Sequence, residues 1–499
     1  MDVAAAAVGA LGGRLDHTLA NLQNAANAAV QGASVTILDE GSEISFLTHG
    51  TLRLKKRPGW GLSVFSLSDA STGVCLRGVK YDAHEFLATA RERGAVAALV
   101  AEDALSQPAV AAVAASGLPL LAVADTRLAL GALAAAWRAR FDLPLLAVTG
   151  SNGKTTSKEM LASILAVAFG DAVLATRGNL NNDIGLPLTL LGLGREHRAA
   201  IVELGMNHPG EIAYLAGIAR PSVALVTNAQ RAHLEGMGSV EAIAREKGTL
   251  FAGLRDDGVA VFCADDAWCD LWQAQAGDRR TLCFTFAGGA PLRGEHRAHG
   301  LENRLTLRYG EESAEVSLAL PGAHNARNAL GAAAAALAAG IPLATVAAGL
   351  AAFTGVKGRL QRRAGHGGAV VLDDTYNANP DSVRAGIDVL AATVGRKLLV
   401  LGDMGEIGEM SGQFHDEVGG YAKSQGVDRL FAFGEASALA ARNFGSGGQH
   451  FARLDELVEA LKAEMQPETT VLVKGSRFMR MERIVEAVVT DAGSAGGQK

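Results

Sequence analysis

Short apolar runs alternate with stretches of helical periodicity through the middle of the chain. Four runs rich in Val, Leu and Ala are each followed by a turn, and often by a helical segment, at 145–150, 199–205, 222–229 and 258–265. Continuous apolar runs of this length, separated by helices, are typical of a parallel sheet covered on both faces. We therefore expect a central α/β domain with a mostly parallel sheet over residues 143–355.

The regions on either side have different patterns. Residues 1–142 contain two apolar runs of strand length, 94–103 and 118–125, with helical patterns around them, and indicate a mixed α/β domain that ends in a linker. After a basic, glycine-rich connector, four more apolar runs end in Gly or Asp. This pattern predicts a smaller, Rossmann-like α/β domain over 356–499, and hence an α/β protein of three domains.

Composition narrows the class of protein. A chain of 499 residues is too long for one core, and 49% hydrophobic with 20% charged residues is ordinary for a globular protein. The net charge of −6 argues against nucleic acid as the main partner. The sequence has no run of about 18 uncharged apolar residues, so no membrane span is predicted. The cysteines have no metal-ligand spacing and fit a reducing cytoplasm: Cys75, Cys263, Cys269 and Cys283.

The segment LLAVTGSNGKTTSKEMLASILA (145–166) contains a candidate phosphate-binding loop. The usual pattern GxxxxGK[ST] requires a glycine where this chain has Val148, and its first glycine is Gly150. The segment nevertheless lies between a strand and an apolar helix, whose N-terminus favours an anion. The alternative is an ordinary strand–turn–helix connection with a surface lysine. The candidate ATP-binding loop comprises Gly150, Ser151, Asn152, Gly153, Lys154, Thr155 and Thr156.

Each loop residue type has a chemical reason to be there. Gly150 and Gly153 allow the backbone to turn tightly and approach phosphate oxygens. Lys154 supplies a positive charge for the β- and γ-phosphates, and Thr155 or Thr156 can offer a hydroxyl to Mg²⁺.

Further polar residues follow the next strands. Glu203 ends a predicted strand, where a carboxylate could bind a metal beside the phosphates, although exposed strand-end glutamates are common. Thr227 and Asn228 end another strand, and His233 follows them, but a lone histidine is more often structural. By its pattern alone, Lys247 is a solvated surface lysine.

The carboxy-terminal region carries a second set of polar residues at strand ends. Asp373, Asp374 and Asn377 follow one apolar run, and Lys474 and Arg477 follow another. In open parallel sheets, ligands bind at the carboxyl ends of strands, so these positions are candidates for ligand contacts. Each is a weak signal alone.

Taken in order, the motifs resemble those of the Mur ligase family, ATP-dependent enzymes that add amino acids to the bacterial peptidoglycan precursor. The resemblance covers about 75–485 and includes the short phosphate loop. It rests on GNLNNDIGLP, ELGMNHPGEI, TNAQRAHLEGMGS, AREKGTLF, DDTYNANPDS, LGDMGEIGEMS with His415, and VLVKGSRFMRME. These segments resemble most the members that join D-alanyl-D-alanine to UDP-N-acetylmuramoyl-tripeptide through an acyl phosphate, so this activity is what the resemblance implies.

The resemblance also implies roles for matching residues. Lys154 and Thr155 match the phosphate and Mg²⁺ contacts, and Glu203 and His233 match metal-site residues of the central domain. Lys247 matches a lysine that family members carbamylate, which makes it a ligand of a second Mg²⁺ and replaces the surface interpretation. Lys154, Glu203, His233, Lys247 and Arg359 thus form the implied catalytic set.

Other matches concern ATP and the sugar nucleotide. The implied contacts to adenine, phosphates and ribose are Asn325, Asn328, Arg359, Asp374 and Asn377. The implied substrate residues are Asn181, Asn182 and Lys474. The resemblance further implies a cytoplasmic protein, which we expect to be a monomer, with the UDP-sugar peptide and D-alanyl-D-alanine as its partners.

The amino-terminal region departs from the family pattern. Such members usually show an STDSR-like stretch before G-x-x-x-D-x-H-x-F, and this chain has only the second half, from Gly78 to Phe86. Either the uridine-binding loop has diverged, or residues 1–73 are outside the family's reading frame, which sequencing of the encoding DNA would decide.

Three other functions are alternatives to this one. A Mur-type ligase that adds the third residue would carry a DNPR-like motif near the carboxy-terminus, and none is found. Folylpolyglutamate synthases share the central fold and short loop but do not suit NLNNDIG and DDTYNANP. The third alternative is a nucleotide-binding protein that has lost ligation.

Overall fold

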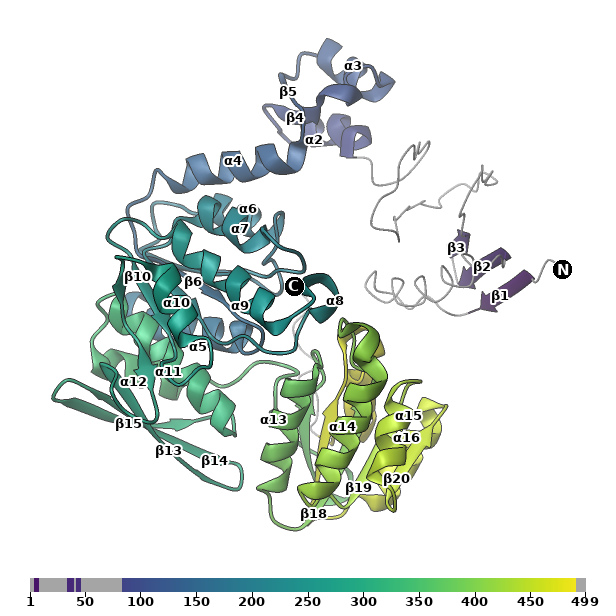
Figure 1. The fold of residues 1–499 in the computed structure, drawn as a ribbon. Coiled ribbons are helices and arrows are strands. Elements are labelled where there is room, and N and C mark those ends of the chain that lie inside the picture. Colours follow the sequence, from purple (N-terminus) through teal and green to yellow (C-terminus); the bar gives the residue numbers. More distant parts are fainter. Residues whose placement is uncertain (1–3, 9–33, 40–41, 46–82, 491–499) are drawn as a thin grey trace. The chain divides into compact units, whose positions relative to one another are not determined.

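The computed structural model describes residues 4–8, 34–39, 42–45 and 83–490 (Figure 1). The chain divides into two compact units, Met1–Ala129 and Leu130–Lys499. Cys75 and the stretch in which a uridine-binding loop is expected lie outside the described residues. No helix in the described ranges combines the length and the apolarity that crossing a bilayer requires.

The described residues of the amino-terminal unit form two small sheets. β1 (Ala4–Val8) and β2 (Ser34–Asp39) are parallel, and β3 (Ser42–Ser45) is antiparallel to β2. β4 (Ala98–Ala101) and β5 (Leu120–Val123) form a parallel pair within the two apolar runs that predict strands. The helical segments within the described part of this unit are η1 (Ala83–Phe86), α2 (Leu87–Glu92), η2 (Glu102–Ala104) and α3 (Pro108–Ala115). α4 (Thr126–Arg138) crosses the division between the units.

Six strands of the second unit form the central sheet, in the order β11-β10-β9-β6-β8-β7, and all neighbours are parallel. The strands are β6 (Leu145–Thr149), β7 (Val173–Ala175), β8 (Ala199–Glu203), β9 (Val223–Val226), β10 (Val259–Phe262) and β11 (Arg280–Thr281). The prediction of a parallel central sheet is confirmed.

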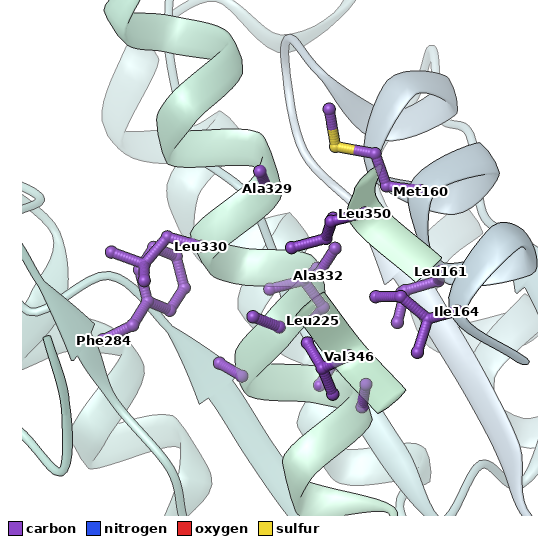
Figure 2. Close-up of a cluster of buried hydrophobic side chains, with 14 of the residues drawn as sticks. Met160, Leu161, Ile164, Leu225, Phe284, Ala329, Leu330, Ala332, Val346 and Leu350 are labelled. Atoms are coloured by element: carbon purple, nitrogen blue, oxygen red, sulfur yellow. The ribbon is translucent and has the colours of Figure 1, made fainter. Parts of the chain in front are cut away.

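Both faces of this sheet are buried. Alternate strand residues point to opposite faces, so Val148 and Leu225 join one core cluster while Ala147 and Val226 join the other. The first cluster contains side chains of α5, α11 and α12, which meet in Figure 2. The helical segments of the domain are α5 (Lys154–Phe169), α6 (Gly185–Leu191), α7 (Glu211–Ala219), α8 (Leu234–Met237), α9 (Val240–Gly248), η3 (Thr249–Gly253), α10 (Cys269–Ala276), α11 (Ala323–Ala338) and α12 (Leu343–Ala352).

A second sheet interrupts the strand–helix alternation that the sequence predicts up to about residue 350. It has the order β12-β13-β14-β15, with β12 parallel to β13 and the other neighbours antiparallel. Its strands are β12 (Phe284–Thr285), β13 (Leu292–His299), β14 (Glu302–Tyr309) and β15 (Glu312–Leu318). Leu305 and Leu307 of β14 are buried against α11, whereas Arg304, Thr306 and Arg308, which alternate with them, are not buried.

The carboxy-terminal sheet has the order β16-β17-β21-β18-β19-β20 and is parallel except for β16. Its strands are β16 (Gln361–Ala364), β17 (Val370–Asp374), β18 (Arg396–Gly402), β19 (Arg429–Phe433), β20 (Gly448–Phe451) and β21 (Thr469–Lys474). The helical segments are η4 (His366–Gly368), α13 (Pro380–Ala391), η5 (Gly408–Met410), α14 (Ser411–Ser424), α15 (Ser437–Phe444), α16 (Leu454–Glu464), η6 (Arg477–Met479) and α17 (Glu482–Val488). This confirms the second α/β sheet.

Candidate active site

The loop between β6 and α5 has a backbone that only glycine adopts easily. Gly150 has φ 152° and Gly153 has φ 81°. A Cβ at Gly150 would lie 1.8 Å from the Thr227 hydroxyl oxygen, and one at Gly153 would lie 2.2 Å from the Asn328 side-chain oxygen. Both glycines are therefore required by conformation and by space, which is how a phosphate loop allows close approach to its backbone.

The end of β9 holds this loop in place. The Ser151 amide donates to the Asn228 carbonyl (3.0 Å), and the Asn152 amide donates to Asn228 Oδ1 (2.9 Å). Thr227 Oγ1 and Asn228 Nδ2 both donate to the Asn152 carbonyl (2.7 and 3.0 Å). Thr227 and Asn228 therefore position the loop backbone.

Lys154 opens α5 and curls back over the loop. Its Nζ donates to the carbonyls of Gly150 (2.7 Å) and Ser151 (3.2 Å). Burial lowers the pKa of Lys154, and the charge of Arg359 lowers it further, whereas the charge of Glu203 opposes these effects. Its ammonium makes no ion pair with a carboxylate among the described residues, so it can neutralise a bound phosphate.

Glu203 ends β8 and is only 2% exposed. Its Oε1 accepts from Asn181 Nδ2 (2.8 Å), whereas Oε2 is buried and has no hydrogen-bond partner among the described residues. An unpartnered buried carboxylate oxygen is costly unless a ligand satisfies it. A hard cation that prefers oxygen ligands fits this position.

Lys247, in the last turn of α9, is 1% exposed, which corrects the interpretation from pattern alone. Burial holds its pKa well below the usual value, and the charge of Lys154 lowers it further, while Glu246 opposes this. No hydrogen bond to its Nζ is found in the described ranges. The sequence contained a signal, because Ile243 and Leu250 lie on the same helical face as Lys247 and are buried.

His233 precedes α8 with a left-handed backbone, φ 58°. Its Nδ1 lies 2.9 Å from Oε2 of Glu406, which belongs to the carboxy-terminal domain. The hydrogen bond from His233 lowers the pKa of Glu406. Glu406 lies within LGDMGEIGEMS, but nothing in that motif predicts the contact. His415 of the same motif is buried, with both ring nitrogens bonded to backbone groups.

No three His, Cys, Asp or Glu side chains gather as a metal-binding group within the part of the chain that the structure describes. Glu203, His233 and the Thr155 hydroxyl therefore do not make a cage by themselves. Protein sites usually bind Mg²⁺ through one or two carboxylates together with phosphates and water.

The candidate adenine residues lie in the first turns of α11 and are buried. Asn325 Nδ2 donates to the Pro321 carbonyl (2.8 Å), and Asn328 Nδ2 donates to Asn325 Oδ1 (3.2 Å). Since Asn328 also lies against Gly153, the pair adjoins the phosphate loop. Thr156, in the first turn of α5, is buried.

Arg359 brings a charge from the carboxy-terminal domain to the loop. Its Nη2 donates to Thr155 Oγ1 (2.9 Å), and its guanidinium lies 4.3 Å from the centre of the Tyr376 ring. Its Nε is buried without a hydrogen-bond partner among the described residues. Two residues that the resemblance assigned to ATP thus meet across more than 200 residues of sequence.

Asp374 and Lys474 end the neighbouring strands β17 and β21 and form an ion pair of 2.6 Å. Lys474 also donates to the Asn377 carbonyl (2.9 Å), and Asp374 Oδ1 accepts from the Leu360 amide (3.2 Å). Asp373 bonds instead to Thr375, and burial raises its pKa. The predicted ATP residue Asp374 and the predicted substrate residue Lys474 are therefore partners of each other.

The two candidate substrate asparagines have different contacts. Asn181 donates to Glu203, as described above, and so adjoins the loop region. Asn182 Oδ1 instead accepts from the amides of Ile184 (3.3 Å) and Gly185 (2.8 Å) at the start of α6. That capping contact accounts for an asparagine at position 182 without a substrate.

Two family models match the chain: the Mur ligase middle domain over residues 148–336, and the Mur ligase glutamate ligase domain over 358–477. The chain is 40% identical over 478 residues to UDP-N-acetylmuramoyl-tripeptide–D-alanyl-D-alanine ligase of Escherichia coli (strain K12), covering 94% of this chain and 98% of that protein.

Solved structures show the same relationship. The crystal structure of MurF from Acinetobacter baumannii has a TM-score of 0.74 at 37% identity, covering 82% of this chain and 88% of that one. The structure of MurF ligase from Thermotoga maritima in complex with ADP has a TM-score of 0.70 at 26% identity, covering 83% and 92%.

Proposed function

Because this chain belongs to the Mur ligase family, we propose that it joins D-alanyl-D-alanine to UDP-N-acetylmuramoyl-tripeptide with consumption of ATP, in the synthesis of the peptidoglycan precursor. The names of its relatives support this choice of substrates, and the ADP complex of one relative supports the nucleotide. Within the structure, the contact of Arg359 with Thr155 carries the proposal, because it joins charges of both domains at one phosphate loop.

The proposed reaction has two steps. A carboxylate oxygen of the tripeptide attacks the γ-phosphorus of ATP, the bond to the β-phosphate bridge breaks, and ADP leaves. The amine of D-alanyl-D-alanine then attacks the carbonyl carbon, the tetrahedral intermediate expels phosphate, and the nitrogen loses a proton. Lys154 and Arg359 serve as fixed positive charges near the transferring group, and such preorganised charge is a large source of rate enhancement.

Two Mg²⁺ ions are part of the proposal. Glu203, with its unpartnered Oε2, would hold one ion together with His233 and the Thr155 hydroxyl, and a modified Lys247 would bind the second. Bound Mg²⁺ would neutralise charge on the phosphates. Asn325, Asn328 and Asp374 would contact the nucleoside, and Asn377 would lie near it, while Asn181 and Lys474 would lie toward the substrate. Asn182 would serve the substrate only indirectly, by fixing the start of α6.

We propose that Lys247 is carbamylated, as the resemblance to the family implies, and its burial supports this. A lowered pKa increases the neutral fraction of the amine, whose lone pair attacks carbon dioxide, forming an N–C bond and releasing one proton. Lys247→Ala should lose most ligase activity, and short carboxylic acids should restore part of it. In ¹³C-bicarbonate, the wild type should show a carbamate signal that the variant lacks. Unchanged rates in the variant would contradict this role.

The function is tested by measuring ADP and amide product together. Purified protein is incubated with ATP, Mg²⁺, D-alanyl-D-alanine and a tripeptide substrate that ends in meso-diaminopimelate or in lysine. We expect ADP to form only when both acceptor substrates are present, with an equal amount of pentapeptide by mass spectrometry. Single amino acids replacing the dipeptide would indicate another Mur-type ligase, and ATP binding without ADP would indicate a protein that has lost ligation.

We also propose that the protein works as a cytoplasmic monomer, since ATP and UDP-linked sugars are cytoplasmic metabolites. Light scattering should then give a mass near 51.4 kDa, and a mass of twice that value would contradict it.

A further inference from the structure

The segment that follows β9 contacts two domains with consecutive residues. The Gln230 amide donates to Ser151 Oγ (2.9 Å), and its side-chain oxygen accepts from Asn152 Nδ2 (2.7 Å), so Gln230 is bound to the phosphate loop. The next residue, Arg231, reaches the carboxy-terminal domain instead. A change at Arg231 can therefore be transmitted to the loop through one peptide unit.

Arg231 is bonded to two carboxylates of that domain. Its Nε and Nη2 donate to Asp381 Oδ1 (3.0 and 2.7 Å), and its backbone amide donates to Oδ2 (2.8 Å). Its Nη1 donates to Glu417 Oε2 (3.0 Å), and its guanidinium lies 5.3 Å from the centre of the Phe414 ring.

These charges are partly removed from water. The side chains of Arg231, Asp381 and Glu417 are 23%, 22% and 32% exposed. Isolated surface ion pairs contribute little, but a guanidinium that is held at several points within a charge network has a defined geometry. This arrangement can therefore fix the position of one domain on the other.

A second contact lies beside the first. Asn379 Nδ2 donates to Asn152 Oδ1 (2.8 Å), while Asn379 Oδ1 accepts from the Ser382 amide (2.9 Å) and caps α13. The start of α13 thus adjoins both the loop and Arg231. Since α13 belongs to the domain that carries Arg359, holding α13 in place also holds Arg359 against Thr155.

We propose that Arg231, Asp381 and Glu417 form an interdomain latch that sets the carboxy-terminal domain on the phosphate loop during catalysis. Arg231 is a positioning residue in this proposal, acting through Arg359 and the loop. The proposal rests on the proposed ligase function. With the latch in place, the acyl phosphate is shielded and meets the amine. Without the latch, water competes for it, so phosphate is released without an amide bond.

The test compares Arg231→Ala with the wild type by measuring phosphate and pentapeptide in the same reactions. We expect kcat to fall about 10- to 100-fold, as for other losses of positioning, and the ratio of phosphate to pentapeptide to rise above one. A purely structural role would lower both products together and leave the ratio unchanged, which would overturn the proposal. Rates and a ratio equal to those of the wild type would also overturn it.

Two further variants keep the test decisive. Arg384→Ala is the matched control, because Arg384 donates to the same Glu417 (2.8 Å) but lies in the same domain as that residue. We expect its phosphate-to-pentapeptide ratio to stay at one. If Arg231→Ala does not fold, Arg231→Lys keeps the charge but loses the guanidinium geometry. It should show the same uncoupling to a smaller degree, and a ratio of one would count against the latch.

A measurement without ligation separates the latch from the proposed function. Small-angle scattering is recorded with a non-hydrolysable ATP analogue and Mg²⁺. The latch predicts a larger radius of gyration for Arg231→Ala than for the wild type and for Arg384→Ala. Equal radii would contradict the latch, whereas absence of pentapeptide from the wild type would contradict only the proposed function.

Discussion

The central and carboxy-terminal sheets each carry a carboxylate at the end of a strand, but only one of these two carboxylates has an ionic partner among the described residues. Asp374, at the end of β17, is paired with Lys474 at 2.6 Å and accepts a backbone hydrogen bond. Glu203, at the end of β8, has an oxygen without a partner among the described residues. The carboxylate of Asp374 is thus paired within its own sheet, whereas the central sheet keeps an acceptor that a ligand can use.

Two buried lysines, one in each domain, also differ in whether an acidic side chain pairs with them. Lys474 is 3% exposed and has an acid partner, while Lys247 is 1% exposed and has its pKa held well below the usual value by burial. Unsatisfied buried charge lowers stability, and it is commonly retained where function needs it. The comparison supports the proposal that the chemistry is centred on the phosphate loop, to which the carboxy-terminal domain contributes Arg359.

Replacement of Glu203 should have the largest effect. Glu203→Gln keeps the shape and the contact to Asn181 but removes the charge on the unpartnered oxygen. If that oxygen binds Mg²⁺, kcat should fall about 10³-fold or more, or more than ~4 kcal/mol in barrier, while the melting temperature stays the same or rises. Near-normal kcat at saturating Mg²⁺ would show that the unsatisfied oxygen has no catalytic use.

Breaking the ion pair between Asp374 and Lys474 should lower stability rather than kcat. Lys474→Met leaves the Asp374 carboxylate, which is 14% exposed, without its partner, and we expect the free energy of unfolding to fall by about 2–3 kcal/mol. Chemical denaturation measures this, and the double variant with Asp374→Asn should recover part of the loss. If the Lys474→Met protein is as stable as the wild type, the ion pair does not stabilise the carboxy-terminal sheet, and the contrast with the central sheet is wrong.

Lys247→Met should change the free energy of unfolding by a smaller amount and should raise it. Between the lowered folded-state pKa and the usual 10.5, the unfolded chain binds a proton that the folded chain does not. Wild-type stability therefore rises with pH in this window. In buffer free of carbon dioxide at pH 7, the variant should be more stable by about 1–2 kcal/mol, and its advantage should shrink as the pH approaches 10.5. If the variant is less stable than the wild type at pH 7, the buried Lys247 amine does not lower stability, which would contradict this prediction.

The pattern of apolar and polar residues predicted the parallel strands and the phosphate loop, because both depend on residues that are close in the sequence. The apolar runs gave the parallel strands, and the loop sequence placed Gly150 and Gly153 at the carboxyl end of β6. The antiparallel sheet β13–β15 was missed because its strands are polar on one face. Alternation around Leu305 and Leu307, between turns at Gly300 and Gly310, could have revealed it.

The contacts between domains could not be predicted from such patterns. Arg231 and Asp381 are separated by 150 positions, and His233 and Glu406 likewise come from different domains. Nothing near Arg231 in the sequence distinguishes it from a solvated arginine. Long-range pairing depends on the relative placement of whole domains, which hydrophobic periodicity does not encode.

The most direct test of the proposed chemistry follows an oxygen atom. The tripeptide substrate is labelled with ¹⁸O in both oxygens of the carboxylate that is to be activated, and the phosphate released during ligation is examined by mass spectrometry. An acyl-phosphate ligase transfers one carboxylate oxygen to each phosphate, so we expect phosphate carrying a single ¹⁸O. Unlabelled phosphate from reactions that form pentapeptide would contradict the account.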